Sequence, residues 1–516
     1  MKENHFKILT IFIVFLLVFL PFINLFMYVF FLNFQLSNIE DLWNFVAFSL
    51  DKRLVNIFLR TIVIGSLTAT FSIILGFALA YLLEFVNIKH PNIWRAVLFT
   101  PFLIPAYFFV FSWLGFLGKR GTFTSITFQN IQIDVYNPAF LIFFLTLSFF
   151  PIAMFIISLG LKNINMNLID AGRLSKSKKV LKKIILPLIK PHLIASFFIV
   201  FSLTVSDYTT SSFLRINTYQ GEIFDQLAVF YNTKMATIYS IPLLLFSFGV
   251  SFCFYYYLKG KRFVTISGMS RKKVIFVKLK NYEKVLVYTF FLSLLLFSLG
   301  IPILMLFIES EFQFSTALLA TKNELISSLV IGGVSSLLIT ILGFFIFHFF
   351  KENNLLNLII IFPLTIPATV IGISLIDLYS TTPIYGNVVL LIICYITRFL
   401  PFSILILSPF LTQLSQNLEE SAKLSTGNFL KIFWKILLPL SKGGFVLSFI
   451  IVFILCLTEI SITQMLAPAG FQTLAMRIDT LMHYANYSFV ASLSLILLIL
   501  IIFLYSIYII VYGEIL

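Results

Sequence analysis

Long apolar stretches recur along almost the whole chain. The 516 residues are 60% hydrophobic and 11% charged, and the mean hydropathy is +1.03. A helix of roughly 20 apolar residues crosses about 30 Å of hydrocarbon, whereas a soluble domain carries about 25% charged residues. Repeated runs of this length exclude a soluble globular fold. We therefore expect an all-α membrane protein.

The apolar runs predict about twelve membrane-spanning helices. They are expected at 7–33, 57–86, 96–117, 138–160, 191–212, 237–259, 285–308, 324–349, 357–380, 386–412, 443–466 and 487–511. The first run is too long for the apolar core of a secretory signal, and no small-x-small cleavage site follows it. We expect it to remain as an uncleaved helix.

The basic residues indicate an orientation in the membrane. If the N-terminus is cytosolic, the C-terminus is cytosolic too, and most of the 36 Lys and Arg residues fall on the cytosolic side. That distribution is typical of the positive-inside rule. The net charge of +15 therefore reflects topology, and we expect contact with membrane lipid and not with nucleic acid. The expected location is the cell inner membrane.

The second half of the chain repeats the first. The segment "FTPFLIPA" at 99–106 matches "IFPLTIPA" at 361–368, and "VFSLTVSD" at 200–207 matches "VFILCLTE" at 452–459. Each unit holds six predicted spans, an even number, so both have the same orientation. A pseudo-twofold axis along the membrane normal then relates them. Transporters commonly use such parallel repeats, with the substrate site at the repeat interface.

The repeat divides the chain into four expected segments. They are an N-terminal transmembrane helix with an external segment at 1–56, the first repeat at 57–260, a basic cytosolic linker with an extra helix at 261–320, and the second repeat at 321–512. The three cysteines fall inside apolar spans without metal-ligand spacing, and we expect them to be inert packing residues.

A polar stretch interrupts the apolar pattern once in each half. The two stretches read "IDAGRLSKSKKVLKKIILP" at 169–187 and "EESAKLSTGNFLKIFWKILLP" at 419–439. Both have helical patterning. In the second, an i, i+3, i+4, i+7 spacing predicts one apolar helix face, formed by Phe429, Ile432, Phe433 and Ile436. In the first, the residues expected to share a face are Val180, Leu181, Ile184 and Ile185.

Each interruption ends in Leu-Pro. We expect Pro187 and Pro439 to break the helix and permit a sharp turn into the next span. Two interpretations of the interruptions are open: an amphipathic helix resting on the membrane surface, or a docking helix for a cytosolic partner. The repeat favours docking, because two equivalent helices suit a partner that is itself two-fold.

The interruptions resemble the "EAA" loop of ABC importer permeases. That pattern is Glu-Ala-Ala, three residues, Gly, nine residues and Ile-x-Leu-Pro. The second copy matches it at Glu420, Ala422 and Pro439, with Thr426 in place of the glycine. The first copy departs further, and its corresponding residues are Asp170, Ala171, Gly172 and Pro187. In that family the loop forms a coupling helix, so the resemblance implies a cytosolic ATPase dimer with one groove for each interruption.

The resemblance also implies that ATP hydrolysis and solute capture are carried out by other proteins. The chain has no Gly-x-x-x-x-Gly-Lys-Ser/Thr phosphate loop, so ATP hydrolysis is expected on a separate subunit, and the chain itself is expected to be no enzyme. The predicted external loops are short. Solute capture is therefore assigned, by resemblance, to a separate extracytoplasmic binding protein. No cofactor and no resident metal are expected.

Charged side chains inside spans are expensive and are candidates for function. Asp207 and Glu459 occupy matching positions of the repeat, and Arg398 lies where the first half has Ser148. One interpretation is that Arg398 neutralises an acidic neighbour and supports packing. The other is that Asp207, Tyr208, Arg398 and Glu459 border the transport pathway.

The fused two-half layout resembles the ferric-iron importer permeases most. The residues that carry this resemblance are "SDYTTSSFLRINTYQGEIF" at 206–224 and "TEISITQMLAPAGFQTLAMRI" at 458–478. Hard ferric iron prefers oxygen ligands, and the side chains of Asp207, Tyr208 and Glu459 would supply them. A carboxylate would also suit a cationic vitamin, so importers of thiamine, and also of phosphonate, stay open as alternatives.

Two other classes compete with an ABC permease. A secondary transporter would show parallel repeats too, but it would not need paired coupling helices, and its uptake would persist without an ATPase. A membrane enzyme is disfavoured, because the five histidines are scattered and no His-Glu-x-x-His or carboxylate cluster occurs.

Overall fold

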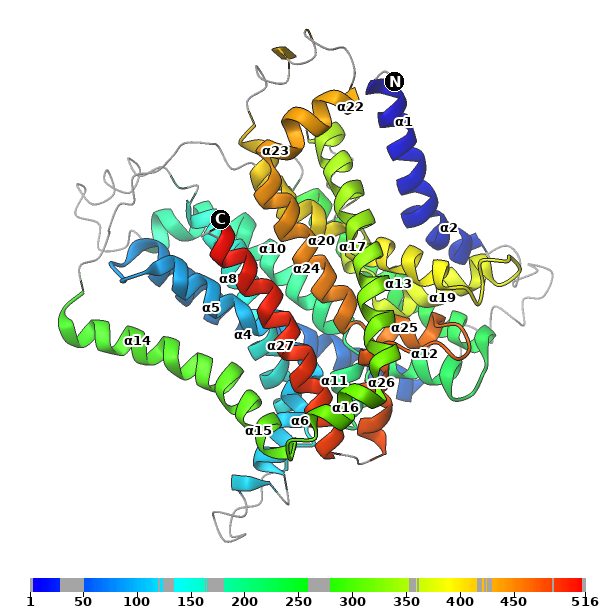
Figure 1. Ribbon diagram of the computed structural model, residues 1–516, viewed down its shortest axis with the longest axis horizontal. Helices are drawn as coiled ribbons and strands as arrows, with labels where there is room; N and C mark the ends of the chain where they lie inside the picture. The colour runs from blue at the N-terminus through cyan, green and yellow to red at the C-terminus, as the bar shows by residue number, and fades with distance from the viewer. Residues whose placement is uncertain are drawn as a thin grey trace.

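The computed structural model describes residues 3–27, 51–118, 121–123, 134–162, 164, 181–258, 279–351, 359, 362–414, 420–421, 424, 429–484 and 487–512. All regular elements in this part of the chain are helices (Figure 1). Nine of the described helices are long and apolar enough to cross a membrane, or eleven if each of two bent pairs is one span. The all-α membrane fold is confirmed. Within the predicted span 357–380, residues 362–365 are helical, and after a break at 366–367 the twelve-residue helix Ala368–Tyr379 follows.

The described helices of the first half are α4 (Lys52–Phe85), α5 (Pro91–Leu103), α6 (Ala106–Leu117), α8 (Pro138–Lys162), η3 (Leu181–Ile185), α10 (Leu186–Val205), α11 (Thr209–Phe213), α12 (Tyr219–Ala228) and α13 (Thr233–Leu258). Those of the second half are α17 (Lys322–Phe350), α19 (Ala368–Tyr379), α20 (Val388–Thr412), α22 (Phe429–Ile432), η5 (Phe433–Leu437), α23 (Leu438–Leu440), α24 (Lys442–Thr458), α25 (Ser461–Leu466), α26 (Leu474–His483) and α27 (Tyr487–Tyr512).

A leading helix precedes each half. The first is α1 (Glu3–Val14), η1 (Phe15–Phe19) and α2 (Leu20–Met27), and the second is α14 (Asn281–Leu295), η4 (Leu296–Gly300) and α15 (Ile301–Glu309), followed by the short α16 (Phe314–Ala320). The first leading helix packs on the second half, and the second packs on the first half and also on α27 of its own half. The Thr397 hydroxyl on α20 donates to the Leu17 carbonyl at 2.7 Å, and the ring of Phe291 on α14 lies 5.2 Å from that of Trp94 on α5. The two halves are therefore clasped together by exchanged helices.

Equivalent glycines position equivalent helix pairs in the two halves. A Cβ on Gly76 of α4 would lie 2.6 Å from the Met154 amide nitrogen of α8, and a Cβ on Gly343 of α17 would collide with Ser403 of α20. Small residues let transmembrane helices approach closely. The repeat seen in sequence is thus also a repeat of close helix contacts.

Hydrogen bonds outside the long helices follow the same repeat. The amide of Tyr219 donates to the Thr61 hydroxyl at 2.9 Å, and the amide of Leu474 donates to the Ser328 hydroxyl at 2.7 Å. These bonds tie the first turns of α12 and α26 to α4 and α17. Because they satisfy amides that a helix start leaves without intrahelical partners, they fix both short helices in equivalent places.

Four π-helical turns each precede a proline. They are η1, η3, η4 and η5, and the next residues but one are Pro21, Pro187, Pro302 and Pro439. A proline ring clashes with the carbonyl four residues before it and supplies no amide donor. A wider turn relieves that clash: the Leu438 amide, for example, bonds to the Phe433 carbonyl five residues back.

Several predicted spans are broken into two helices. An angle of 86° separates α5 from α6, where Ile104 is extended directly before Pro105. The proline ring clashes with the residue before it when that residue is helical, so an extended conformation is favoured there. The predicted spans 191–212 and 443–466 end early as well, at Val205 and Thr458, before α11 and α25 begin. Continuous helices over 96–117, 191–212 and 443–466 were therefore wrong.

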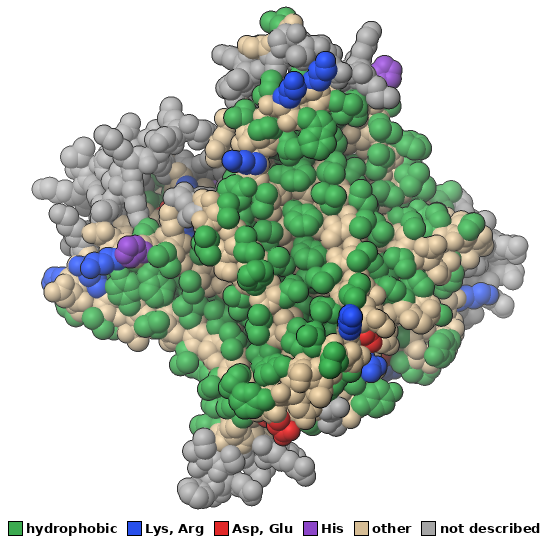
Figure 2. Space-filling view, in the orientation of Figure 1, with side chains coloured by type: hydrophobic (Ala, Val, Ile, Leu, Met, Phe, Trp, Pro, Cys, Tyr) green, Lys and Arg blue, Asp and Glu red, His purple; other side chains and the backbone are tan. Residues whose placement is uncertain are grey.

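The outer surface has the character of a lipid-facing surface. Figure 2 shows hydrophobic side chains over the middle of one face. Exposed apolar side chains include Val330 and Leu337 of α17 and Phe503 of α27. Basic side chains gather at the end that carries α22 and α23 (Figure 2). Lys431 and Lys435 are exposed at that end.

Candidate transport site

The broken helices of both halves converge on one cavity. Its volume is about 140 Å³. Among its lining residues are Tyr107, Ser148, Asp207 and Thr209 of the first half and Leu364, Arg398, Thr458, Glu459 and Ser461 of the second. The cavity therefore lies at the repeat interface, where the sequence places a transport pathway. Its most distinctive polar side chains come from the chain breaks after α10 and α24.

The two carboxylates at these breaks have the same structural role. Asp207 Oδ1 accepts from the Thr210 amide at 2.9 Å, and Oδ2 accepts from the Thr210 hydroxyl at 2.8 Å. Glu459 Oε1 accepts from the Ile462 amide at 3.2 Å. Each carboxylate thereby caps the short helix that follows it. This cap explains why the preceding helix stops, and it holds a negative charge at the cavity.

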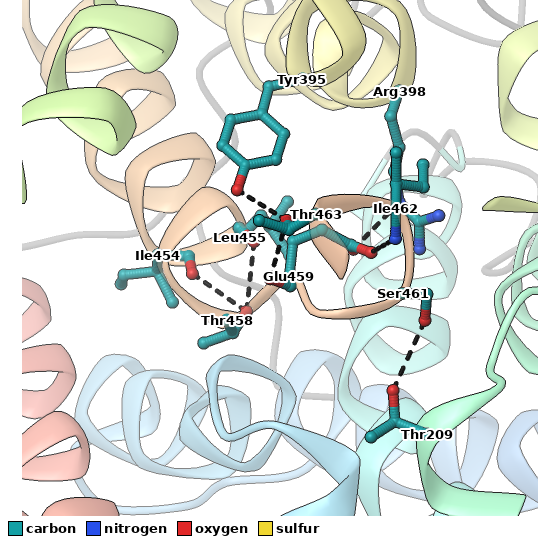
Figure 3. A network of polar contacts seen from close by, with 10 residues as sticks. All are labelled: Thr209, Tyr395, Arg398, Ile454, Leu455, Thr458, Glu459, Ser461, Ile462 and Thr463. Carbon is teal, nitrogen blue, oxygen red and sulfur yellow. Dashed lines mark hydrogen bonds and ion pairs between the residues drawn. The ribbon is translucent and has the colours of Figure 1, made fainter. Parts of the chain in front are cut away.

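An ion pair joins the second-half carboxylate to the arginine of the neighbouring helix. Arg398 Nε on α20 lies 3.2 Å from Glu459 Oε2, and 17% and 8% of the two side chains are exposed. Figure 3 shows both side chains directed toward each other, with Tyr395 and Thr463 beside them. The Tyr395 and Thr463 hydroxyls are 2.8 Å apart, and Thr463 donates to the Glu459 carbonyl at 3.1 Å.

The two halves also meet through a pair of equivalent hydroxyls. Thr209 Oγ1 and Ser461 Oγ lie 3.4 Å apart, although the residues are 252 positions apart in sequence (Figure 3). Thr209 begins α11 and Ser461 begins α25. Because the two positions correspond in the repeat, this contact lies on or close to the pseudo-twofold axis.

The structure thus brings together three of the four predicted pathway residues. Asp207, Arg398 and Glu459 all line the cavity. Tyr208 is adjacent in sequence, but its ring stacks on Phe224 with centroids 4.2 Å apart. Tyr107, a buried residue directly after the repeated "IPA" motif, also lines the cavity and was not among the predicted pathway residues. The polar hydroxyl of Tyr107 within an otherwise apolar run could have marked it as a candidate cavity residue.

The second polar interruption forms the predicted amphipathic helix. Phe429, Ile432 and Phe433 are buried and Ile436 is half-buried, as the spacing predicts. The ring of Phe429 lies 5.5 Å from that of Phe6 on the first leading helix. Trp434 in the same helical segment is exposed, and Glu420 and Leu424, which precede that segment, are exposed as well.

The helix of the first interruption differs from the prediction. Ile185 is buried and Ile184 half-buried, whereas Leu181 is exposed. Pro187 also does not turn the chain, because η3 and α10 form one continuous helix, Leu181–Val205. Pro187 is the second residue of α10 and follows a π-helical turn, and proline is tolerated in a first helical turn. In the second half a bend of 82° does occur, at Ser441 just after Pro439.

Other predicted coupling residues lie outside the described residues. They are Asp170, Ala171, Gly172, Val180, Ala422 and Thr426. Both chain ends do lie near the second interruption. Phe6 of α1 contacts Phe429, and a Cβ on Gly443, at the start of α24, would lie 3.4 Å from Tyr512 of α27.

Comparison with known proteins agrees with this architecture. Residues 339–513 match the family described as binding-protein-dependent transport system inner membrane component. The match lies in the second repeat, and together with the repeated helices and the cavity between them it supports a multi-pass permease of the ABC importer class.

Individual relatives extend the similarity beyond the second half. The chain is 26% identical over 430 residues to "Fe(3+)-transport system permease protein FbpB 2" of Haemophilus influenzae, covering 79% of this chain and 80% of that protein. It is 23% identical over 432 residues to "Ferric transport system permease protein FbpB" of Actinobacillus pleuropneumoniae, covering 76% and 62%. A "Putative ABC transporter permease protein ORF2" of Caldicellulosiruptor is 35% identical over 127 residues, covering 24% and 46%.

Proposed function

We propose that this chain is the transmembrane subunit of an ATP-driven importer that passes ferric iron from an extracytoplasmic binding protein to the cytosol. The observation that carries the proposal is the cavity between the repeats, with the carboxylates of Asp207 and Glu459 at its wall. Two relatives that match most of the chain are named as ferric transport permeases. Carboxylate oxygens are the ligand type that suits a hard cation.

In this proposal the polar interruptions couple transport to a cytosolic ATPase dimer. The coupling residues are Asp170, Ala171, Gly172, Pro187, Glu420, Ala422 and Pro439. The exposed side of the second interruption supports docking, because Leu424 is 90% exposed and Trp434 is 63% exposed beside a buried apolar face. With this end in the cytosol, both termini are cytosolic and Lys431 and Lys435 follow the positive-inside rule.

The proposed organisation keeps the two repeats at 57–260 and 321–512 as the permease units. The segments at 1–56 and 261–320 then supply the leading helices that clasp the opposite unit. Asp207, Tyr208, Arg398 and Glu459 belong to the pathway or its immediate support, with the three cavity residues closest to the solute.

The test is reconstitution in lipid vesicles with an ABC ATPase and an extracytoplasmic binding protein from the same organism. We expect ATP-dependent accumulation of radiolabelled ferric iron, and none without the ATPase. Thiamine and a phosphonate serve as competing solutes. Accumulation of either of these in place of iron would assign a different solute, and iron uptake without the ATPase would indicate a secondary transporter.

A further inference from the structure

The hydroxyl of Tyr107 is buried beside the cavity without a partner. Tyr107 is the second residue of α6, directly after the break, and is 4% exposed. Its Oη has no hydrogen-bond partner among the described residues, although the ring lines the cavity. Buried polar groups are normally satisfied, so this hydroxyl is available to bind a group that enters the cavity.

The carboxylate oxygens of Asp207 and Glu459 differ in their bonding partners. Both oxygens of Asp207 accept hydrogen bonds from Thr210, in the same short helix. Glu459 uses Oε1 for its helix cap, but its Oε2 faces Arg398 on a different helix. The Arg398 contact can therefore be exchanged without unwinding α25. Oε2 of Glu459 is the carboxylate oxygen that is best placed to bind a passing cation.

Among the described residues, only the second half contributes a positively charged side chain, Arg398, to the cavity wall. The position equivalent to Arg398 in the first half is Ser148, which also lines the cavity and is 2% exposed. The cavity wall consequently holds two carboxylates and one guanidinium. A carboxylate buried in a membrane protein needs a counter-charge, and the guanidinium supplies it at the place that a transported cation would take.

We propose that Arg398 is a resident counter-ion of Glu459 that a hard multivalent cation displaces during transport, and that the Tyr107 hydroxyl is a further oxygen ligand of that cation. Tyr107 binds through an oxygen lone pair as the neutral phenol, so the exchange moves no proton and breaks no covalent bond. Arg398 balances the charge of Glu459 while the site is empty and competes with the cation for that carboxylate. The identity of the cation rests on the proposed function, whereas the exchange rests on the cavity geometry.

The test is calorimetric titration of the purified full-length permease with Tb³⁺, a hard trivalent cation that prefers oxygen ligands. Arg398→Gln should bind Tb³⁺ about tenfold more tightly than the wild type, because one charge-assisted contact no longer competes. Tyr107→Phe should bind about tenfold more weakly, and Glu459→Gln should lose the site. Tyr505→Phe is the matched control, because Tyr505 is a buried tyrosine that bonds to the Ala96 carbonyl away from the cavity.

The direction of the Arg398 effect decides the proposal. A merely structural arginine would not improve binding when it is removed, so unchanged or weaker binding in Arg398→Gln overturns the counter-ion role. If that variant does not accumulate, Arg398→Lys replaces it: the lost Nε contact should tighten binding by a smaller factor, and unchanged or weaker binding again overturns the role. Unchanged Tb³⁺ affinity in Tyr107→Phe overturns the ligand role of Tyr107.

Failure of the proposed function would look different. If Tb³⁺ binds with the expected order of affinities but the reconstituted importer accumulates no ferric iron, the cation site stands and the iron assignment fails. Absence of Tb³⁺ binding in both the wild type and Arg398→Gln, in protein that remains monodisperse, overturns the site itself.

Discussion

Thr209 and Ser461 approach within 3.4 Å of each other from equivalent positions in the two halves. Each begins a short helix that follows a capping carboxylate, so the pseudo-twofold repeat brings two chain breaks to one place. A rigid continuous helix could not present its backbone end and a capping carboxylate in the middle of a bundle. The breaks are therefore what create a polar cavity inside an otherwise apolar protein.

The first prediction concerns this contact. In a background in which the native cysteines are replaced, Thr209→Cys with Ser461→Cys should form a disulfide on oxidation and stop transport, because the halves can no longer separate at the axis. A reductant should restore uptake. Pairing Thr210→Cys with Ser461→Cys is the control, because the Thr210 hydroxyl is directed to Asp207. Full transport in the cross-linked protein would show that the solute does not pass here.

The second prediction concerns the ion pair of Arg398 with Glu459. Arg398→Ala and Glu459→Ala should each destabilise the folded protein by about 3–5 kcal/mol, because each leaves an unpaired buried charge. The double variant should recover part of that loss. Membrane abundance and thermal unfolding of all four forms measure the effect. Equal abundance of the single and double variants would mean that the charges do not support each other, and normal abundance with lost uptake in each would indicate a pathway role alone.

The third prediction concerns coupling. Glu420→Lys should uncouple transport from ATP hydrolysis while leaving the permease in the membrane, because Glu420 is exposed and belongs to the proposed docking helix. Co-purification of the ATPase and solute uptake are the two measurements. Asp170→Lys should have a milder effect, because the first copy departs further from the family pattern. Undiminished ATPase yield together with normal uptake in Glu420→Lys would refute the docking role.

The fourth prediction concerns helix packing. Gly76→Ala should destabilise the protein by about 1–3 kcal/mol, because the new methyl group meets the α8 backbone and overpacks the interface. Gly249→Ala in α13 is the matched control, since a Cβ there meets nothing within 4 Å. Thermal unfolding in detergent compares the two. Equal stability of both variants would contradict the assigned close contact.

The sequence by itself determined the class of fold and the equivalence of the two halves. Hydrophobic runs specify which segments are long and apolar enough to span a membrane, since that property is local in the chain. The repeat placed Asp207 and Glu459 in matching positions, and the spacing around Phe429 predicted its buried helix face. These inferences needed residue types and their order, without knowledge of which helices touch.

Only the tertiary structure decided which groups meet. It divided the span at 96–117, kept the helix continuous through Pro187, exchanged the leading helices between the halves and placed Tyr107 at the cavity. An apolar helix surface can pack on many partners with similar energy, so its sequence does not specify its neighbour. The choice follows from shape, such as the close approach of α8 to Gly76, and from polar groups such as Arg398 and Glu459 that find a partner only when distant segments are brought together.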